Sequence, residues 1–520
     1  MAMAAQTLFS LATYGYLVRV VGAEQVGAWV SLMAAGMLAC VADLGLSHAL
    51  IRQLSVVLHG RQEPAGAGVP ETIETIVATV AGTTGFALLL AWLSFPWWSS
   101  WISAPAAVVQ PGQWLGFVLV GLWLNRVADA LAGALDGQQR FVERSLASAA
   151  ALLCGLMLTI VAVPHWGMQG FAVAFVAQNA LLLLSFAVQL RHLTPALRWS
   201  RPRLRPAVLR DALRYGLSVQ LLVMCFLVIE SIVKLSLART GNLAELAYFD
   251  LAFRIGKGVR GLMASALRVL VPRLAPLGSD VGGADLRHQA YAKSFAALQL
   301  FSLPIFAAIV AGAQLLSVAL VGRDEPAFVA ALAASLAAWL GYNLTDPAMN
   351  LALSSGRMRW PVLGHVMALG LVLCAATIGW PSNQGASTSG LYLQVAMAIL
   401  VGCLATMVGV HHGEGAGWRL LRPVHTLVAL ACGAAIGLFG LSVDTLLPAW
   451  SAPERWAAVS TVLAAYTASL WRLNPAGRLI WGALTSGVMC KASTADQPAN
   501  RVAAAEPDKT LIHTPLKRGN

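Results

Sequence analysis

Acidic and basic side chains recur inside apolar stretches of the sequence, at spacings that place them on shared helical faces. Two such stretches hold opposite charges three or four residues apart: Glu230, Lys234, Asp250, Arg254, Lys257 and Arg260. An ionisable group inside a membrane helix costs at least about 2.5–3.5 kcal/mol, so such groups pair with one another or face a hydrated cavity. The i,i+4 pairs Glu230–Lys234 and Asp250–Arg254 can neutralise each other as purely structural pairs.

The apolar stretches also hold cations that lie outside these two pairs. Lys257, Arg260 and Arg126 are not members of either i,i+4 pair. A cavity with surplus positive charge attracts an anionic headgroup, and the guanidinium fork of arginine fits phosphate oxygens. We therefore predict a set of substrate contacts from the polar residues of these helices: Asn125, Arg126, Lys234, Arg254, Lys257, Arg260 and Asn343.

Intramembrane carboxylates are candidates for coupling transport to a proton or cation gradient. These are Asp129, Glu230 and Asp346, each of which is explained equally well as a satisfied structural group. The chain has no GxxxxGK phosphate loop followed by Ser or Thr, so an ion gradient is the energy source we expect. Asp43 and Arg52 lie near the predicted inner face, as a candidate gate pair or as interfacial anchors.

Each half of the chain also carries a polar stripe. Asn125 and Asp129 form one, and Asn343 and Asp346 form the other, at a nearly equivalent place. The two stripes suggest a shared central cavity. The seven cysteines are scattered without a CxxC pair, so we expect no disulfide framework, no metal site and no cofactor.

The elements that carry these groups are predicted to be membrane helices. Hydrophobic residues make up 58% of the 520 residues and charged ones 11%, against about 25% charged in soluble domains. Residues 75–125, 145–190 and 360–413 contain no Asp, Glu, Lys or Arg, and each is long enough for two helices of about 20 residues. The alternating polarity of barrel strands is missing, so the sequence predicts an all-α, polytopic integral membrane protein.

About 14 transmembrane helices are expected. They cover residues 1–18, 26–50, 72–94, 113–135, 144–163, 168–190, 210–237, 247–272, 291–316, 327–352, 359–380, 391–411, 424–443 and 456–473. The predicted outer connections hold only four basic residues, Arg19, Arg239, Arg323 and Arg455, which places both termini in the cytoplasm. The net charge of +12 is then a basic face toward anionic lipid, and no nucleic-acid partner is expected.

The two halves of the chain repeat short patterns at a constant offset. Arg19 and Arg239 lie 220 residues apart, and Arg140 and Arg359 lie 219 apart, at equivalent places in the predicted topology. We therefore expect two six-helix lobes of parallel topology and two extra helices. The predicted divisions are an N-terminal lobe (1–190), a basic cytoplasmic linker (191–209), a C-terminal lobe (210–411), two additional helices (412–473) and a disordered cytoplasmic tail (474–520).

Several segments resemble motifs of a known family. Residues 16–29, YLVRVVGAEQVGAW, resemble the opening of polysaccharide exporters, an Arg, two hydrophobic residues and two spaced glycines before an aromatic residue. Residues 42–47 resemble the DLG element of that family, 131–144 its G-x-x-R link, and 248–255 its Y-x-x-A-x-R-I hairpin. The chain is thus similar, over residues 1–475, to Wzx-type flippases of the multidrug/oligosaccharidyl-lipid/polysaccharide exporter superfamily, although its first helix is shorter.

The resemblance implies a flippase, not an enzyme. Its substrate would be an oligosaccharide repeat unit linked to polyprenyl pyrophosphate, moved across the bacterial cytoplasmic (inner) membrane by alternating access. The product pathway would be a surface polysaccharide: the O-antigen of lipopolysaccharide, a capsule or an exopolysaccharide. Implied partners are the lipid-linked oligosaccharide, membrane lipid and a polysaccharide polymerase complex.

Three other functions remain open. A peptidoglycan lipid-precursor flippase of the same superfamily shares the fourteen spans and the cationic cavity. A drug/cation antiporter is disfavoured by the span count and the cationic helix around Lys257. An integral-membrane polymerase or glycosyltransferase would need acidic catalytic residues in a long outer loop, whereas the predicted outer loops are short and poor in acids.

Overall fold

The structure is a computed structural model that describes residues 2–58, 68–99, 112–197, 202–239, 242–267, 283–355, 358–378, 388–413, 423–446 and 451–473. In these ranges the chain forms helices and short connections, with no strand, so the predicted all-α class is confirmed. The first half contains α1 (Ala2–Val20), α2 (Ala23–Ala39), the 3-10 helix η1 (Cys40–Asp43), α3 (Leu46–Leu58), α4 (Val69–Leu93), α5 (Phe95–Trp98), α6 (Gly112–Gly137) and α7 (Phe141–Leu193).

The second half continues in the same all-helical manner. It contains α8 (Pro206–Arg239), α9 (Leu243–Leu267), α11 (Gly283–Ala311), α12 (Ala313–Val321), α13 (Pro326–Ser355), α14 (Arg359–Ile378), α15 (Thr388–Gly413), α16 (Pro423–Leu446) and α17 (Ala452–Leu473). The predicted tail (474–520) lies outside the described residues.

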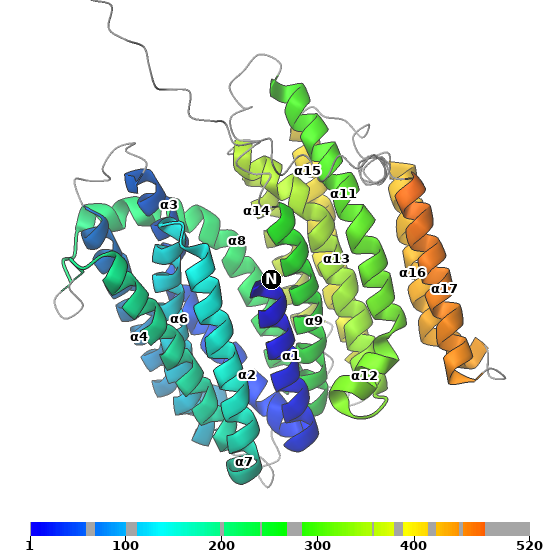
Figure 1. The fold of residues 1–520 in the computed structure, drawn as a ribbon, viewed down its shortest axis with the longest axis horizontal. Coiled ribbons are helices and arrows are strands. Elements are labelled where there is room, and N and C mark those ends of the chain that lie inside the picture. Colours follow the sequence, from blue (N-terminus) through cyan, green and yellow to red (C-terminus); the bar gives the residue numbers. More distant parts are fainter. Residues whose placement is uncertain are drawn as a thin grey trace, which may run out of the picture.

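Nine helices of the described part of the chain are long and apolar enough to cross a membrane, which confirms a polytopic membrane protein. Helix α9 fails that criterion because it carries five charged residues: Glu245, Asp250, Arg254, Lys257 and Arg260. It nevertheless lies in the middle of the bundle, where the charges can find partners (Figure 1). The count of fourteen spans stays a prediction.

Helix α7 is two membrane passages in one element. Its 53 residues would extend about 80 Å if straight, well over twice the hydrocarbon thickness. Gly167 breaks it with φ 54 and ψ −136, a left-handed conformation that glycine adopts readily, three residues after Pro164. The two predicted helices, 144–163 and 168–190, are therefore present on either side of this break.

The predicted helix over 26–50 is present as an apolar span over Ala23–Asp43, but its predicted end at residue 50 is wrong. Its apolar pattern runs on, but the backbone tightens into η1 and then turns through Leu44 (φ 51) and Gly45 (φ 73) before α3 begins. Two successive residues with positive φ cannot continue a right-handed helix. The predicted helix over 291–316 is likewise divided at Gly312 into α11 and α12.

Figure 1 shows two neighbouring bundles, with α16 and α17 at the outer edge of the second. We keep the two-lobe division as a proposal and call α1–α7 the N-terminal lobe and α8–α15 the C-terminal lobe. The lobes meet where α2 packs on α8 and α9, and where α1 packs on α9 and α12. Small residues allow close approach: Gly27 faces the Leu243 backbone, and Gly258 faces the Thr7 side chain.

The linker between the lobes is held on α4. Glu74, whose side chain is 2% exposed, accepts hydrogen bonds from the backbone N–H (2.9 Å) and the Nε (3.2 Å) of Arg203. Arg205 forms a second ion pair, with Glu71 at 3.1 Å. Helix α8 then starts at Pro206, four residues before the predicted start, and places Val208 in the core of the N-terminal lobe. The same helix packs on α14 of the C-terminal lobe.

Candidate functional site

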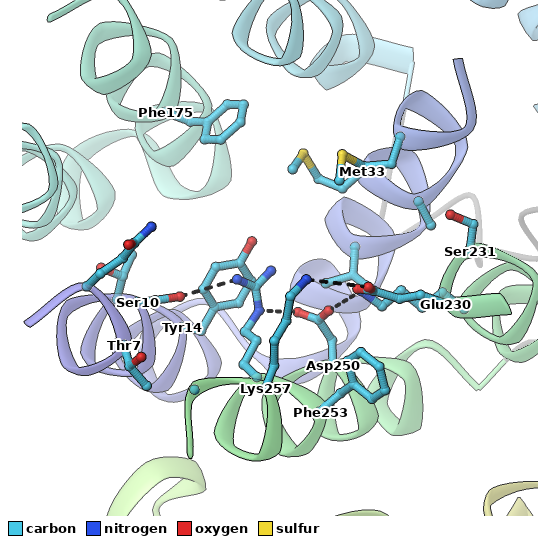
Figure 2. A pocket seen from close by; sticks show the side chains of 18 of the residues that line it. Thr7, Ser10, Tyr14, Met33, Phe175, Glu230, Ser231, Asp250, Phe253 and Lys257 are labelled. Atoms are coloured by element: carbon cyan, nitrogen blue, oxygen red, sulfur yellow. Dashed lines mark hydrogen bonds and ion pairs between the residues drawn. The ribbon is translucent and has the colours of Figure 1, made fainter. Parts of the chain in front are cut away.

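A pocket of about 440 Å³ lies between the lobes. Its walls come from α1, α2 and α7 on one side and from α8 and α9 on the other (Figure 2). The charged lining residues all belong to the second wall: Glu230, Lys234, Asp250, Arg254 and Lys257. The first wall contributes uncharged groups: Gln6, Thr7, Ser10, Thr13, Tyr14, Val30, Met33, Ala34, Met37, Leu152, Phe171, Phe175 and Gln178.

The five charged residues form one chain of alternating sign, which we call the ion chain. Its order is Lys257, Glu230, Lys234, Asp250, Arg254. The successive N–O distances are 3.6, 2.5, 2.6 and 2.6 Å. Both ends are cations, so the described pocket lining carries three positive and two negative charges.

Exposure differs between the middle and the ends of the ion chain. The side chains of Glu230, Lys234 and Asp250 are 14%, 9% and 1% exposed, whereas those of Arg254 and Lys257 are 28% and 55% exposed. Charges removed from water persist only when they are paired, which the inner three are. The two terminal cations have one acid each and face the pocket, where they can meet an anion.

The predicted pairs Glu230–Lys234 and Asp250–Arg254 are confirmed. Two further contacts, Lys234–Asp250 and Lys257–Glu230, join α8 to α9. The expectation that Lys257 is an unpaired surplus cation is therefore wrong, because Glu230 forms ion pairs with both lysines. The surplus is one charge shared by the ion chain as a whole.

Arg126 does not belong to the pocket lining. Its Nη1 lies 3.4 Å from Asp129 on the same helix, so it is paired and not a surplus cation. Its Nη2 lies 3.7 Å from the Sδ of Met37, a residue that does line the pocket. Asn125, its neighbour, donates a hydrogen bond to Asn179 at 3.1 Å.

Arg260 is also paired and is directed elsewhere. It lies 2.7 Å from Asp346 of α13, and its guanidinium lies 5.3 Å from the centroid of the Tyr342 ring. At 100° per residue, Arg260 is rotated about 80° from Asp250 around α9, which turns it toward α13. Asn343 donates to Ser302 at 2.9 Å inside the same lobe.

The two polar stripes therefore do not share the central pocket. Neither Asn125 and Asp129 nor Asn343 and Asp346 are among its lining residues. Each stripe instead makes contacts within its own lobe. Asp43 accepts hydrogen bonds from Ser47 at 3.3 Å and is buried, while Arg52 is exposed on α3. A gate formed by Asp43 and Arg52 stays a prediction.

Sequence reasoning missed the contribution of α1. Gln6, Ser10 and Tyr14 follow at steps of four, which aligns them on one helical face that lines the pocket. That spacing was visible in the sequence, but the helix carries no Asp, Glu or Lys to draw attention to it. Asp250 was identified only as half of a local pair, although it joins Lys234 and Arg254. No group of three or more His, Cys, Asp and Glu side chains in the described ranges could hold a metal ion.

Solved structures with the same fold are membrane transporters. The lipid II flippase MurJ in an inward closed conformation aligns with a TM-score of 0.65 at 10% identity, covering 90% of this chain and 97% of that one. An inward-facing multidrug resistance MATE family transporter of the MOP superfamily gives 0.59 at 16% identity, covering 79% and 95%. A MOP superfamily transporter from Pyrococcus furiosus, described by the reverse polarity of its binding pocket, gives 0.51 at 14% identity, covering 80% and 93%.

At these identities the likeness shows the fold alone. A comparison with curated protein sequences gave no match. Residues 16–324 match the sequence profile of a family described as polysaccharide biosynthesis protein. The matched segment includes α2, α7, α8 and α9, which supply most of the pocket walls. Because the match spans more than half of the 520 residues, the chain belongs to the polysaccharide biosynthesis protein family.

Proposed function

We propose that the protein is a flippase for oligosaccharide repeat units linked to polyprenyl pyrophosphate, serving the synthesis of a surface polysaccharide such as O-antigen, capsule or exopolysaccharide. The ion chain carries this proposal. Its two cationic ends, Arg254 and Lys257, face a pocket between two lobes, and its buried middle keeps them in place.

A pyrophosphate group suits these two ends. Arg254 and Lys257 are three residues apart on α9, and side chains at that spacing are neighbours about 5–6 Å apart at Cβ. Arginine offers a planar fork to one phosphate, and lysine offers a mobile point charge to the next. Arg254 is 28% exposed, and a charge-assisted hydrogen bond is stronger in such a partly buried place than in water.

The opposite wall suits the sugars. Gln6, Ser10 and Gln178 supply amide and hydroxyl groups for sugar hydroxyls, and Met33 and Phe175 supply apolar surface (Figure 2). In this proposal the headgroup occupies the pocket while the prenyl tail stays in lipid between the lobes. Rocking of the lobes then carries the headgroup from the cytoplasmic to the outer face.

Among the three coupling candidates, Asp129 is the one we favour for protonation. Glu230 forms ion pairs with two lysines, and Asp346 is paired with Arg260 at 2.7 Å. The Asp129 side chain is 46% exposed, and its contact with Arg126 is longer, at 3.4 Å. A carboxylate that is less tightly held exchanges a proton at lower cost.

The setting of the proposal is the bacterial inner membrane with both termini in the cytoplasm. We further propose that the protein hands its cargo to a polysaccharide polymerase, as the resemblance implies. A second candidate is a flippase for the peptidoglycan lipid precursor, because the fold matches that of the lipid II flippase MurJ. The two cargoes differ in their sugars, so the site chemistry at Arg254 and Lys257 serves either one.

The test is complementation of a deletion strain with the wild type, Arg254→Ala and Lys257→Ala, measuring surface polysaccharide and the lipid-linked units that accumulate. Arg140→Ala is the matched control, because Arg140 pairs with Glu143 on the exposed surface, outside the pocket. We expect assembled repeat units to accumulate on the inner leaflet, with complementation lost in Arg254→Ala and reduced in Lys257→Ala at normal membrane levels, while the control succeeds. Units that reach the outer leaflet unpolymerised would instead show a polymerase, and accumulation of lipid II would show the second candidate.

A further inference from the structure

Arg254 crosses from the C-terminal lobe to α1 of the N-terminal lobe. Its Nη1 donates a hydrogen bond to the Ser10 hydroxyl at 3.3 Å, and its Cζ lies 3.6 Å from the centroid of the Tyr14 ring. This is the distance of a planar group stacked on an aromatic face. Figure 2 shows Ser10 and Tyr14 on the side of the pocket that faces Asp250 and Lys257.

The other two cations of the ion chain approach rings differently. Lys234 and Lys257 lie 5.9 Å from the rings of Phe253 and Phe226. Those rings belong to α9 and α8, within the same lobe as the lysines. Of the cations that line the described pocket, Arg254 is thus the one whose aromatic contact spans the two lobes.

Three contacts fix the guanidinium of Arg254, and one edge of this group stays available to a ligand. Nε is held by Asp250 at 2.6 Å, Nη1 by Ser10, and the flat face by Tyr14. No acceptor among the described residues takes a hydrogen bond from Nη2, and the side chain lines the pocket. A guanidinium fixed on three sides loses little freedom when its remaining edge binds an anion.

Tyr14 is itself held firmly. It is 8% exposed, and its ring meets Phe171 of α7 edge to face at 6.1 Å. Phe171 packs in turn on Trp29 of α2 at 4.9 Å. The stack under Arg254 is therefore anchored in three helices of the N-terminal lobe.

We propose that Tyr14 is a positioning residue, which holds the guanidinium of Arg254 so that its Nη2 edge meets a phosphate oxygen of the substrate. The inference rests on the proposed function and deepens it. The anion site is complete only while α1 of one lobe lies against α9 of the other. Separation of the lobes removes Tyr14 and Ser10 from Arg254, which loosens the site and favours release of the pyrophosphate group.

The test measures binding of inorganic pyrophosphate to the purified full-length protein by calorimetry. The variants are Tyr14→Leu, Tyr14→Phe and Tyr16→Leu, where Tyr16 is a tyrosine of the same helix that does not line the pocket. We expect Tyr14→Leu to raise the Kd about tenfold, the effect of losing a partly desolvated cation–π contact. Tyr14→Phe and Tyr16→Leu should bind like the wild type.

Arg254→Gln separates positioning from general damage. If Tyr14 acts through Arg254, Tyr14→Leu should raise the Kd no further in the Arg254→Gln background. The inference is overturned if Tyr14→Leu binds pyrophosphate like the wild type, if Tyr14→Phe fails as Tyr14→Leu does, or if the two substitutions are additive. If the folded wild type binds no pyrophosphate, the proposed function fails first, and the two failures are thereby distinguished.

Discussion

The two walls of the pocket differ sharply in charge. The wall formed by α8 and α9 holds the whole ion chain, whereas the described lining of the N-terminal wall has no acid and no lysine or arginine. The ion pairs are thus completed within one lobe and can stay intact when the lobes move. The N-terminal wall contacts them through α1, where Ser10 and Tyr14 meet Arg254. We infer that the wall formed by α8 and α9 provides the charged groups, and that the N-terminal wall holds Arg254 in its orientation.

The largest effect is expected from Asp250→Asn, which removes the buried acid that joins two cations of the ion chain. Asp250 is 1% exposed and pairs with both Lys234 and Arg254 at 2.6 Å. Removing one partner of a buried ion pair costs about 3–5 kcal/mol. The melting temperature of the purified protein should fall, and transport in the deletion strain should be lost. The matched control, Glu143→Gln at an exposed pair, should melt like the wild type. An unchanged melting temperature for Asp250→Asn would show that the ion chain is not a structural unit.

A disulfide between the walls should stop transport without removing the anion site. A Cβ added at Gly258 would lie 3.1 Å from the Thr7 Cβ, so α1 and α9 need to move apart only slightly to reach the separation of about 3.5–4.5 Å in disulfides. We expect the pair Thr7→Cys and Gly258→Cys, made after replacing the seven native cysteines, to lose transport on oxidation and regain it on reduction. Its affinity for pyrophosphate should persist when it is oxidised. The reduced pair and Thr7→Cys alone are the controls, because a Cβ at Gly258 would clash with the Cγ2 of the native Thr7. Full transport by the oxidised pair would contradict the rocking of α1 against α9.

A smaller effect is expected from Lys257→Met, which removes one end of the ion chain. This side chain is 55% exposed, and its contact with Glu230 is 3.6 Å long. A partly solvated pair contributes about 1 kcal/mol or less, so transport should fall about fivefold and the melting temperature should stay constant. A complete loss equal to that of Asp250→Asn would mean that the exposed end matters as much as the buried middle.

The smallest effect is expected from Arg323→Ala, because Arg323 is not among the residues that line the pocket. Its side chain is 70% exposed and pairs with Glu325 at 2.7 Å. Exposed pairs contribute about 0–1 kcal/mol because water and salt screen them. Complementation and melting temperature should match the wild type. A clear loss of complementation would place a functional contact at this exposed turn.

Local features of the site could be predicted from the sequence, and contacts between helices could not. The pairs Glu230–Lys234 and Asp250–Arg254 follow from i,i+4 geometry alone. The contact of Lys234 with Asp250 depends on how α8 packs on α9, and Asp346 lies 86 residues from Arg260. Contacts between helices pair two of the three cations expected as surplus, Lys257 with Glu230 and Arg260 with Asp346.

The fold shows the same division between local and distant causes. The turn at Gly167 was visible as a glycine three residues after Pro164. The turn at Leu44 could not be predicted from the sequence, because a leucine adopts a φ of 51° only where the surrounding structure requires it. The face of α1 that lines the pocket was readable from Gln6, Ser10 and Tyr14. Its neighbour Arg254 was not, because that contact joins residues 244 positions apart.

The most direct test of the central claim is transport in reconstituted liposomes. Purified protein is incorporated with a lipid-linked oligosaccharide in the membrane, and the fraction of headgroups that reaches a membrane-impermeant sugar-oxidising enzyme is followed over time. We predict that the wild type and Arg140→Ala expose headgroups from the inner leaflet, whereas Arg254→Ala does not. Movement of headgroups at the wild-type rate by Arg254→Ala, or no movement by the folded wild type, would contradict a flippase that works through the ion chain.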